Sequence, residues 1–268
     1  MEATNEFDTD GNDPDEIQAA VDRFLRPRPI PLTNRDNALL EQGKPLRLGC
    51  GLMATAWGQG PLVLLAHGWE SRRSHWSAFV PALTEAGFTA LAIDAPAHGD
   101  SPGEISHMPL YARNLLEIGR EFGHLRGIVG HSFGAGASAI ALARGLPADR
   151  GVFIAGPTSI DGLMARWCRA NRIPEAAIPR FIELVAEAVG ESTDFFDLTR
   201  EAARIEKPGL IVHDRSDDDI PLIDAENLAA VWKTSRLHIT EKYGHKRILI
   251  ARPVVQEVVR FLAAPTPE

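Results

Sequence analysis

The sequence has little cysteine and no long apolar run. Its two cysteines, Cys50 and Cys168, are too far apart in the chain to suggest a metal-binding pair. We interpret both as free thiols of a reducing compartment and predict a cytoplasmic location. No stretch approaches the roughly 18 apolar residues that a membrane span needs. The N-terminus also lacks the basic and apolar regions of a signal peptide.

Basic residues are absent from the first 22 positions, which hold eight acidic residues. The rest of the chain carries 28 basic and 28 acidic residues, so the net charge of −8 belongs to this leader. The composition predicts an acidic, flexible leader over residues 1–30 and offers no basic surface for nucleic acid. The stretch Asp8–Asp13 resembles a calcium loop, but the EF-hand needs glycine at its sixth position, where this chain has Asp13. We therefore expect no calcium site there.

The whole chain has a globular composition, with 44% hydrophobic and 24% charged residues in its 268. After the leader, short apolar runs alternate with helical patterns, which predicts an α/β fold with a mostly parallel central sheet flanked by helices. We place one domain at residues 31–265. Strands are expected at Leu62–Ala66, Thr89–Ile93, Leu125–Val129, Gly151–Ala155, Gly209–His213 and Arg236–Thr240, and helices near residues 73–86, 108–122, 133–145, 222–232 and 250–263.

The stretch between Gly156 and Pro208 interrupts this alternation, because it shows helical patterns and no convincing strand. We predict a short helical cap at about residues 157–207; two ordinary crossover helices are the alternative. One helical face there carries Ile178, Phe181, Ile182, Val185 and Val189. The apolar side chains of the stretch either contact substrate or form the core of the cap, and the sequence does not decide between these roles. They are Leu163, Met164, Trp167, Ile173, Phe181, Phe195 and Phe196.

The segment Gly130-His131-Ser132-Phe133-Gly134 follows a strand pattern and precedes a helix of small residues. This is the G-x-S-x-G arrangement in its required context, in which the serine occupies a strained turn. The glycines let strand and helix approach closely, and the helix N-terminus favours a developing oxyanion. Ser132 is therefore the candidate nucleophile; the alternative is a structural turn serine.

Four segments in the same order make the chain resemble the α/β-hydrolase superfamily, in particular small bacterial serine hydrolases with a short helical cap. The resemblance runs from about Pro61 to Leu262 and implies an α/β-hydrolase fold. It also implies that the backbone N–H groups of Trp69 and Phe133 form the oxyanion hole. The segments are His67-Gly-Trp-Glu, Asp94-Ala-Pro-Ala-His-Gly-Asp-Ser, the serine motif, and the pair His213-Asp-Arg-Ser-Asp-Asp-Asp-Ile-Pro and Gly244-His-Lys-Arg-Ile-Leu.

The family order of serine, then acid, then histidine leaves two histidines as candidate bases. His238 falls within a strand pattern, whereas His245 follows it in a loop, so we expect His245 to be the base. In similar proteins the acid stands four residues before the proline that ends its motif, which selects Asp217 here. Asp218 and Asp219 remain alternatives, and we expect one of them to cap the following helix.

Other polar residues of these segments have weaker indications. Glu70 follows the expected oxyanion residue, and its contact with substrate, or with Arg72 or Arg73, is a less favoured interpretation. We expect the remaining histidines of the motifs to be structural, with their hydrogen bonds satisfied; they are His67, His98 and His131.

These residues predict a serine hydrolase of carboxylic esters or thioesters that works through an acyl-enzyme. Ser132 would attack the carbonyl, His245 would accept its proton, and Asp217 would orient His245. The serine argues against the epoxide-opening and halide-displacing branches of the superfamily, which need a carboxylate there. The alternatives are amide or peptide hydrolysis or acyl transfer on the same triad, and a non-catalytic binding protein on this fold.

The expected substrate is a small molecule with a partly apolar acyl group. We expect no cofactor, no metal, no nucleic acid and no membrane span. The sequence does not indicate an oligomeric state.

Overall fold

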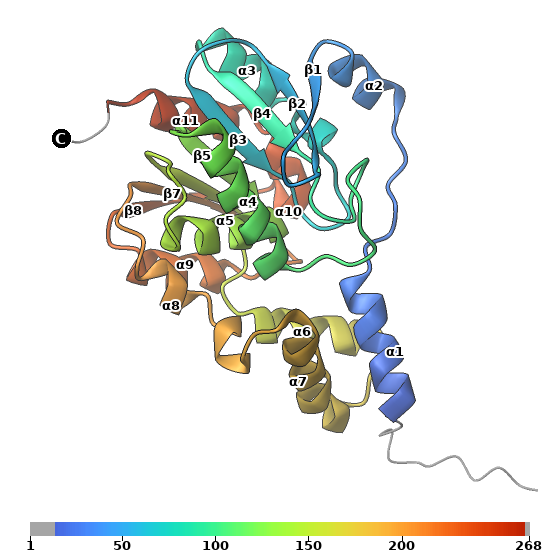
Figure 1. Ribbon diagram of the computed structural model, residues 1–268. Coiled ribbons are helices and arrows are strands. Elements are labelled where there is room, and N and C mark those ends of the chain that lie inside the picture. Colours follow the sequence, from blue (N-terminus) through green and yellow to red (C-terminus); the bar gives the residue numbers. More distant parts are fainter. Residues whose placement is uncertain (1–13, 266–268) are drawn as a thin grey trace, which may run out of the picture.

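A computed structural model describes residues 14–265 of the chain (Figure 1). Within these residues an eight-stranded sheet has the order β1-β2-β4-β3-β5-β6-β7-β8. Neighbouring strands from β4 to β8 are parallel, whereas β1 and β2 are antiparallel at one edge. The predicted mostly parallel sheet is confirmed. The strands are β1 Lys44–Arg47, β2 Met53–Trp57, β3 Leu62–Ala66, β4 Thr89–Ile93, β5 Gly127–His131, β6 Gly151–Ile154, β7 Gly209–Asp214 and β8 Ser235–Thr240.

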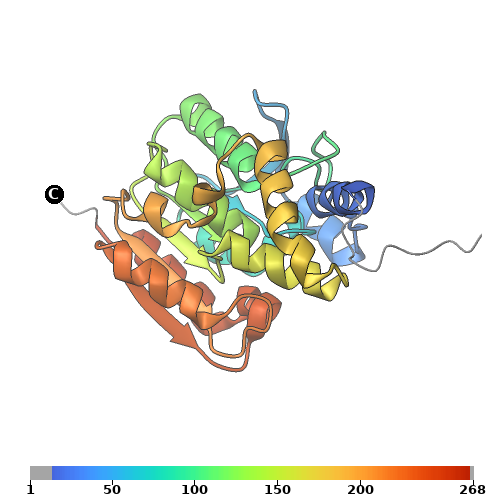
Figure 2. The same cartoon turned by 90° about the horizontal axis from the view of Figure 1, so that it is seen from below.

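Helices cover both faces of this sheet (Figures 1 and 2). The α-helices are α1 Pro14–Leu25, α2 Asn34–Leu40, α3 Phe79–Glu85, α4 Met108–Phe122, α5 Phe133–Ala143, α6 Ile160–Ala170, α7 Ile178–Val189, α8 Thr199–Ala202, α9 Leu222–Val231, α10 Gly244–Arg247 and α11 Arg252–Ala263. Short 3-10 helices are η1 Arg73–Trp76, η2 Glu175–Ala177, η3 Thr193–Phe196 and η4 Ile248–Ile250.

Two apolar cores explain why the strand sequences are continuously hydrophobic. Successive side chains of a strand point to opposite faces of the sheet. Leu64 accordingly packs in one core with α4 and α5, and Leu65 packs in the other with α3 and α11. Both residues are fully buried. A strand with helices on both faces therefore has no solvent-facing position that would favour a polar residue.

Most predicted elements are present, with shifted ends. Strands β3 and β4 and helix α4 have the predicted bounds. The helix expected at residues 73–86 is divided into η1 and α3, with Ser77 and Ala78 between them. The edge strands β1 and β2 were not predicted. Strand β1 is mostly exposed, so it has no apolar run to mark it.

The stretch from residue 157 to 207 contains α6, α7 and α8 and, apart from one isolated bridge between Ser159 and Asp197, no strand pairing. The predicted apolar face of α7 is buried, with Ile182 only half-buried. Met164 and Phe181 are fully buried and therefore belong to the core. Three of the apolar residues that we listed are half-buried, namely Leu163, Trp167 and Ile173. The side chain of Phe196 lies outside what the structure describes.

Helix α1 contradicts the prediction of a flexible leader through residue 30. It buries Ile17, Ala20, Val21 and Leu25, which recur at helical spacing. Acidic residues in its first turn favour the helix N-terminus, so the charge that suggested disorder also suits this helix. Helix α1 packs against α7, and α1, α6 and α7 gather at one end of the molecule (Figures 1 and 2). The folded domain therefore includes α1 and does not begin at residue 31.

The acidic residues before Pro14, including the rejected calcium-loop stretch, lie outside the described residues. Both cysteines are free, as predicted, and Cys168 is buried. Among the helices of residues 14–265, none is long and apolar enough to cross a bilayer.

Candidate active site

Ser132 occupies a strained turn between β5 and α5. Its backbone has φ 52° and ψ −117°, a left-handed conformation that costs a non-glycine residue about 1–3 kcal/mol. The Ser132 N–H donates to the carbonyl of Ile154 at 2.9 Å, which helps to hold the turn on the neighbouring strand. The side chain is half-buried. Ser132 thus follows the end of β5 directly, in a strained turn of the kind that the motif predicts.

The two glycines of the motif are required by close packing. A Cβ on Gly130 would lie 2.5 Å from the carbonyl oxygen of Gly134. A Cβ on Gly134 would lie 2.1 Å from the carbonyl oxygen of Ala66, at the end of β3. Both distances are shorter than real Cβ contacts, so any larger residue would displace the turn that carries Ser132.

His245 and Asp217 come together from the connections after β8 and β7; Asp217 lies in a loop, whereas His245 lies in the short helix α10 and not in the predicted loop. The Nδ1 atom of His245 lies 2.8 Å from Oδ2 of Asp217. The other carboxylate oxygen, Oδ1, accepts the N–H groups of Asp219 at 2.9 Å and Ile220 at 2.8 Å. Asp217 is 8% exposed. Burial acts to raise the pKa of the Asp217 carboxyl, but the hydrogen bonds from His245 and Ile220 outweigh it and lower the pKa.

Asp214, at the end of β7, joins these two loops. Its side chain is fully buried and accepts the Ser216 N–H at 2.9 Å, the Thr240 hydroxyl at 2.8 Å and the Tyr243 N–H at 3.1 Å. Burial opposes ionisation, yet backbone hydrogen bonds, first that from Gly244, hold the pKa of Asp214 below its ordinary value. The carboxylate thus fixes the backbone on both sides of the His245–Asp217 contact. Sequence reasoning missed this structural role of Asp214, because nothing in the sequence distinguishes it from the other aspartates of the motif.

His131 links the loop of His245 to the nucleophile turn. Its Nε2 lies 2.9 Å from the carbonyl oxygen of His245, and the two imidazole rings are 4.9 Å apart. Burial, followed by the charge of His245, lowers the pKa of His131 to about 3, so its ring stays neutral. Within the described residues no hydrogen bond joins Ser132 to His245. Such contacts often shorten only when substrate is bound.

The loop after β3 lies against Ser132. A Cβ on Gly68 would be 3.2 Å from the Cβ of Ser132, so the next residue, Trp69, lies close to this serine. Among residues 14–265, the backbone N–H groups of Trp69 and Phe133 have no hydrogen-bond partner. The side chains of these two residues also pack together, with ring centroids 5.2 Å apart. The two amides are thus available to a ligand oxygen beside Ser132.

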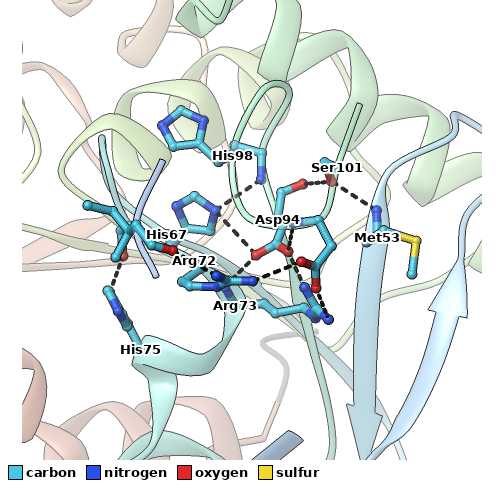
Figure 3. Close-up of polar contacts among 12 residues, drawn as sticks. Met53, His67, Arg72, Arg73, His75, Asp94, His98 and Ser101 are labelled. Carbon is cyan, nitrogen blue, oxygen red and sulfur yellow. Dashed lines mark hydrogen bonds and ion pairs between the residues drawn. The ribbon is translucent and has the colours of Figure 1, made fainter. Parts of the chain in front are cut away.

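A buried ionic network around Asp94 and Arg73 lies next to this loop (Figure 3). Asp94, at the end of β4, is fully buried, and its Oδ1 accepts the Arg73 N–H at 2.7 Å. The Arg73 guanidinium binds the other oxygen of Asp94 and also Asp100. Gly99 adopts φ 55°, and a Cβ there would lie 2.2 Å from Oδ2 of Asp94. The network ties the loop after β4 to η1, which follows the Trp69 loop.

Comparison with known proteins identifies the family. The profile of the alpha/beta hydrolase family matches residues 63–258, well over half of the chain. The chain belongs to this family. The hydrolase is similar in structure to an esterase of Pyrococcus furiosus, with a TM-score of 0.70 and 20% identity, covering 91% of this chain and 98% of that one. An esterase from Exiguobacterium antarcticum has a TM-score of 0.64 and 18% identity, covering 83% and 100%. These likenesses confirm the predicted α/β-hydrolase fold.

Curated relatives of the hydrolase match over shorter stretches. Bifunctional epoxide hydrolase 2 of Sus scrofa is 30% identical over 118 residues, which are 42% of this chain and 21% of the relative. A pimeloyl acyl-carrier protein methyl ester esterase of Methylococcus capsulatus is 48% identical over 52 residues, 19% of this chain and 20% of that protein. A human serine hydrolase-like protein is 37% identical over 90 residues, 31% and 44% respectively. The chain therefore spans less than half the length of these relatives.

Two histidines of the hydrolase are structural, as predicted. His67 Nδ1 donates to the Gly68 carbonyl at 2.7 Å, and Nε2 accepts the Ala95 N–H at 3.0 Å. His98 Nδ1 donates to the Pro96 carbonyl at 2.8 Å, and Nε2 accepts the Glu70 N–H at 3.1 Å. Burial lowers the pKa of both rings, well below the ordinary range for His67. Because both Nε2 atoms act as acceptors, both imidazoles are neutral. His238 lies within β8, as expected.

Two expectations about acidic residues are wrong. Glu70 pairs with neither Arg72 nor Arg73; its carboxylate binds Arg28, from the N-terminal segment. Arg73 is already bound by buried Asp94. Asp218 and Asp219 do not cap α9, whose N-cap residue is Pro221 without a side-chain hydrogen bond. Both aspartates are exposed. For Glu70, sequence distance is misleading, since its partner Arg28 lies 42 positions away in the chain.

A cavity of about 260 Å³ lies beside His245. Its lining includes Ser216, Asp218, Tyr243 and Lys246. A larger hollow of about 780 Å³ lies between α3 and α11 and contains none of the candidate residues. We place the candidate site at the strand ends, because Ser132, Asp217 and His245 follow the ends of β5, β7 and β8. Within residues 14–265, no group of three or more His, Cys, Asp or Glu side chains could hold a metal ion.

Proposed function

We propose that this alpha/beta hydrolase is a serine hydrolase that cleaves carboxylic esters or thioesters through an acyl-enzyme. The observation that carries the proposal is the 2.8 Å contact between His245 Nδ1 and the buried carboxylate of Asp217. It lies next to the turn that exposes Ser132, since His131 binds the His245 backbone. A serine, a histidine and an orienting carboxylate in this order are what nucleophilic acyl transfer needs.

The contact with Asp217 decides which nitrogen of His245 can act as the base. The carboxylate accepts a hydrogen bond from Nδ1–H, so the proton of the neutral ring stays on Nδ1 and its lone pair is on Nε2. Nε2 would take the proton of the Ser132 hydroxyl as its oxygen attacks the substrate carbonyl. Asp217 stabilises the imidazolium that results, and its lowered pKa keeps it ionised during the step.

The attack places a negative charge on the former carbonyl oxygen. In our proposal the unpaired N–H groups of Trp69 and Phe133 bind this oxygen, and the N-terminus of α5 adds its dipole. Imidazolium Nε2 then donates its proton to the leaving alcohol or thiol. Water, deprotonated by the same nitrogen, attacks the acyl-serine and releases the acid. His131 and His67 do not compete for these protons, because burial keeps both rings neutral.

Epoxide opening, suggested by the names of some curated relatives, is not part of the proposal. Attack of a serine oxygen on an epoxide carbon would form an ether, which water does not cleave under these conditions. A carboxylate nucleophile would instead form an ester that can be hydrolysed. With Ser132 at the turn, turnover requires an acyl group on the enzyme.

The substrate that we propose is a small molecule with a partly apolar acyl group. Trp69 and Phe133, whose backbones lie close to Ser132, carry aromatic rings with centroids 5.2 Å apart. We further propose that α6 and α7 act as the cap of the site. The esterases of similar fold are consistent with this class of substrate. The two free thiols suit a reducing compartment, so a cytoplasmic location stays a prediction.

Covalent labelling and ester hydrolysis test the proposal together. The purified protein should be labelled by a fluorophosphonate probe and should hydrolyse p-nitrophenyl esters in a series of increasing acyl length. Ser132→Ala should abolish labelling and lower turnover by several orders of magnitude, with an unchanged circular dichroism spectrum. Retention of more than about a tenth of the activity in Ser132→Ala would exclude this serine as the nucleophile. Absence of labelling in the wild type would favour a non-catalytic binding protein.

A further inference from the structure

The segment after α1 reaches the loop that follows Trp69. Arg28 binds the carboxylate of Glu70 through two side-chain bonds, Nε to Oε1 at 2.8 Å and Nη2 to Oε2 at 2.6 Å. The Arg28 backbone N–H also donates to Oε1 at 3.2 Å. Glu70 is the residue next to the proposed oxyanion donor. The proposed mechanism gives no role to this pair, although it lies one residue from the reacting groups.

A second contact holds the same loop from the N-terminal side. Arg72 is only 4% exposed, and its Nη1 donates to the Ile30 carbonyl at 2.8 Å. Its Nη2 binds Asp100 at 3.0 Å. Glu70 itself adopts φ 47°, a conformation that a non-glycine residue keeps only when its surroundings impose it. Contacts from residues 28 and 30 are among those surroundings.

At its other end, the segment begins from α1, where Phe24 packs against α6 and α7. The ring of Phe24 lies 5.2 Å from that of Trp167 and 5.5 Å from that of Phe181, edge to face in both cases. The Leu25 carbonyl accepts the Ser106 N–H at 2.8 Å. Residues 24–30 therefore span from the helices proposed as the cap to the loop that carries the proposed oxyanion donor.

We infer that Arg28 is a positioning residue of this active site, which holds the loop of Trp69 through Glu70, with α1 as its anchor. The inference rests on the proposed role of Trp69 as an oxyanion donor. Arg28 contacts no reacting atom; it acts through the backbone next to one. The N-terminal segment is thus a structural part of the site.

The exposure and charge of the Arg28–Glu70 pair also support a positioning role. The Arg28 side chain is 84% exposed and that of Glu70 is 20% exposed. The hydrogen bond from Arg28 has the largest effect on the pKa of the Glu70 carboxyl; it lowers this pKa, whereas burial acts to raise it. An exposed pair contributes little to the stability of the whole fold. Removal of the Arg28 guanidinium, however, leaves the Glu70 carboxylate without its counter-charge, beside a group that must bind an oxyanion. The effect is therefore expected in kcat rather than in Tm.

Three variants of the full chain test the inference. Arg28→Gln removes the charge, and Arg28→Lys keeps it without the two-pronged geometry. Arg26→Gln is the matched control, since Arg26 lies in the same segment but pairs with Glu104, at 57% and 78% exposure. The measurements are kcat and KM on a p-nitrophenyl ester that the wild type cleaves, Tm, and amide hydrogen exchange of the peptide covering residues 67–72.

Arg28→Gln should lower kcat about five-fold, as expected for a displaced donor and an unpaired nearby charge. Its KM should stay within about two-fold of the wild type and its Tm within about 2 °C. Exchange in residues 67–72 should become faster. Arg28→Lys should recover part of the lost kcat, and Arg26→Gln should match the wild type in every measurement.

Equal kcat for Arg28→Gln and Arg26→Gln overturns the inference, and so does a fall in kcat without faster exchange at residues 67–72. Hydrogen exchange also separates this inference from the proposed function, because it needs no turnover. If the wild type cleaves no ester, the esterase proposal fails. Faster exchange in Arg28→Gln then still supports the positioning contact, whereas unchanged exchange overturns it.

Discussion

The imidazole of His245 and the carboxylate of Asp217 meet at 2.8 Å although 28 positions separate them in the chain. Asp217 follows β7 and His245, in α10, follows β8; these strands pair in parallel and so end at the same edge of the sheet. The same contact distinguishes Asp217 from its neighbours. Asp218 and Asp219 are exposed, whereas Asp217 is buried with both carboxylate oxygens occupied. The predictions below start from this relationship.

Asp217→Asn should reduce ester turnover by roughly 10⁴, the cost of the same change in serine-protease triads. Because Oδ1 already accepts two backbone N–H groups, an asparagine would turn its NH2 group toward Nδ1, which favours the wrong tautomer of His245 and removes the counter-charge of its cation. The measurement is turnover of one activated ester, and circular dichroism of the variant shows whether the fold is intact.

Asp218→Asn and Asp219→Asn are the matched controls for this substitution. Neither side chain caps α9, so each should leave kcat within about two-fold of the wild type. A steep loss in Asp219→Asn with normal activity in Asp217→Asn would assign the acid to position 219. Mild losses in all three variants would place the acid elsewhere.

Asp214→Asn should lower both stability and activity. The side-chain amide would face backbone N–H groups that now donate to the carboxylate, which leaves buried donors unsatisfied at about 1–3 kcal/mol. The loops of Asp217 and His245 would lose their common anchor, so kcat should fall roughly ten-fold or more. Thermal unfolding and turnover should change together. A variant with normal Tm and strongly reduced kcat would instead indicate a direct chemical role for Asp214.

Two truncations separate the leader from α1. Deletion of residues 1–13 should leave Tm and turnover nearly unchanged, because this stretch is acidic and poor in core-forming residues. Deletion of residues 1–25 removes buried Ile17, Val21 and Leu25 and uncovers α7, so Tm should fall by about 5 °C or more. The measurement is thermal unfolding of the two proteins beside the full chain. Equal Tm values would mean that α1 does not contribute to stability.

His107 should make the fold sensitive to acid. It caps α4, since its Nδ1 accepts the Leu110 N–H at 3.3 Å. Burial, then the charge of Arg113, lowers the pKa of His107 from 6.5 to about 4. Between these two pKa values, His107 binds a proton in the unfolded chain but not in the folded one. The free energy of unfolding therefore falls as the pH drops from 6.5 to about 4.

His107→Asn keeps a capping acceptor but cannot titrate. Its Tm should therefore decline less steeply than that of the wild type over this pH range. Parallel Tm curves for the two proteins would show that His107 does not contribute to acid sensitivity.

The sequence alone determined the fold class and the nucleophile turn. Continuous apolar strands such as Leu62–Ala66 occur where both faces of a sheet are covered, so they predict a parallel sheet without knowledge of partners. The spacing of Gly130, Ser132 and Gly134 is likewise local. It reflects steric limits within a few residues, and the structure has the expected positive φ at Ser132.

The tertiary structure decided which residues share a partner. The chain places Glu70 near Arg72 and Arg73, but folding brings Arg28 to it and gives Arg73 to Asp94. The acidic composition of residues 1–22 led us to predict disorder where α1 forms. The apolar face of α1 is buried because α7 packs against it, and the sequence does not show that contact. Local pattern encodes what neighbouring residues impose on one another, whereas ion pairs and docked helices depend on distances that only the packed chain defines.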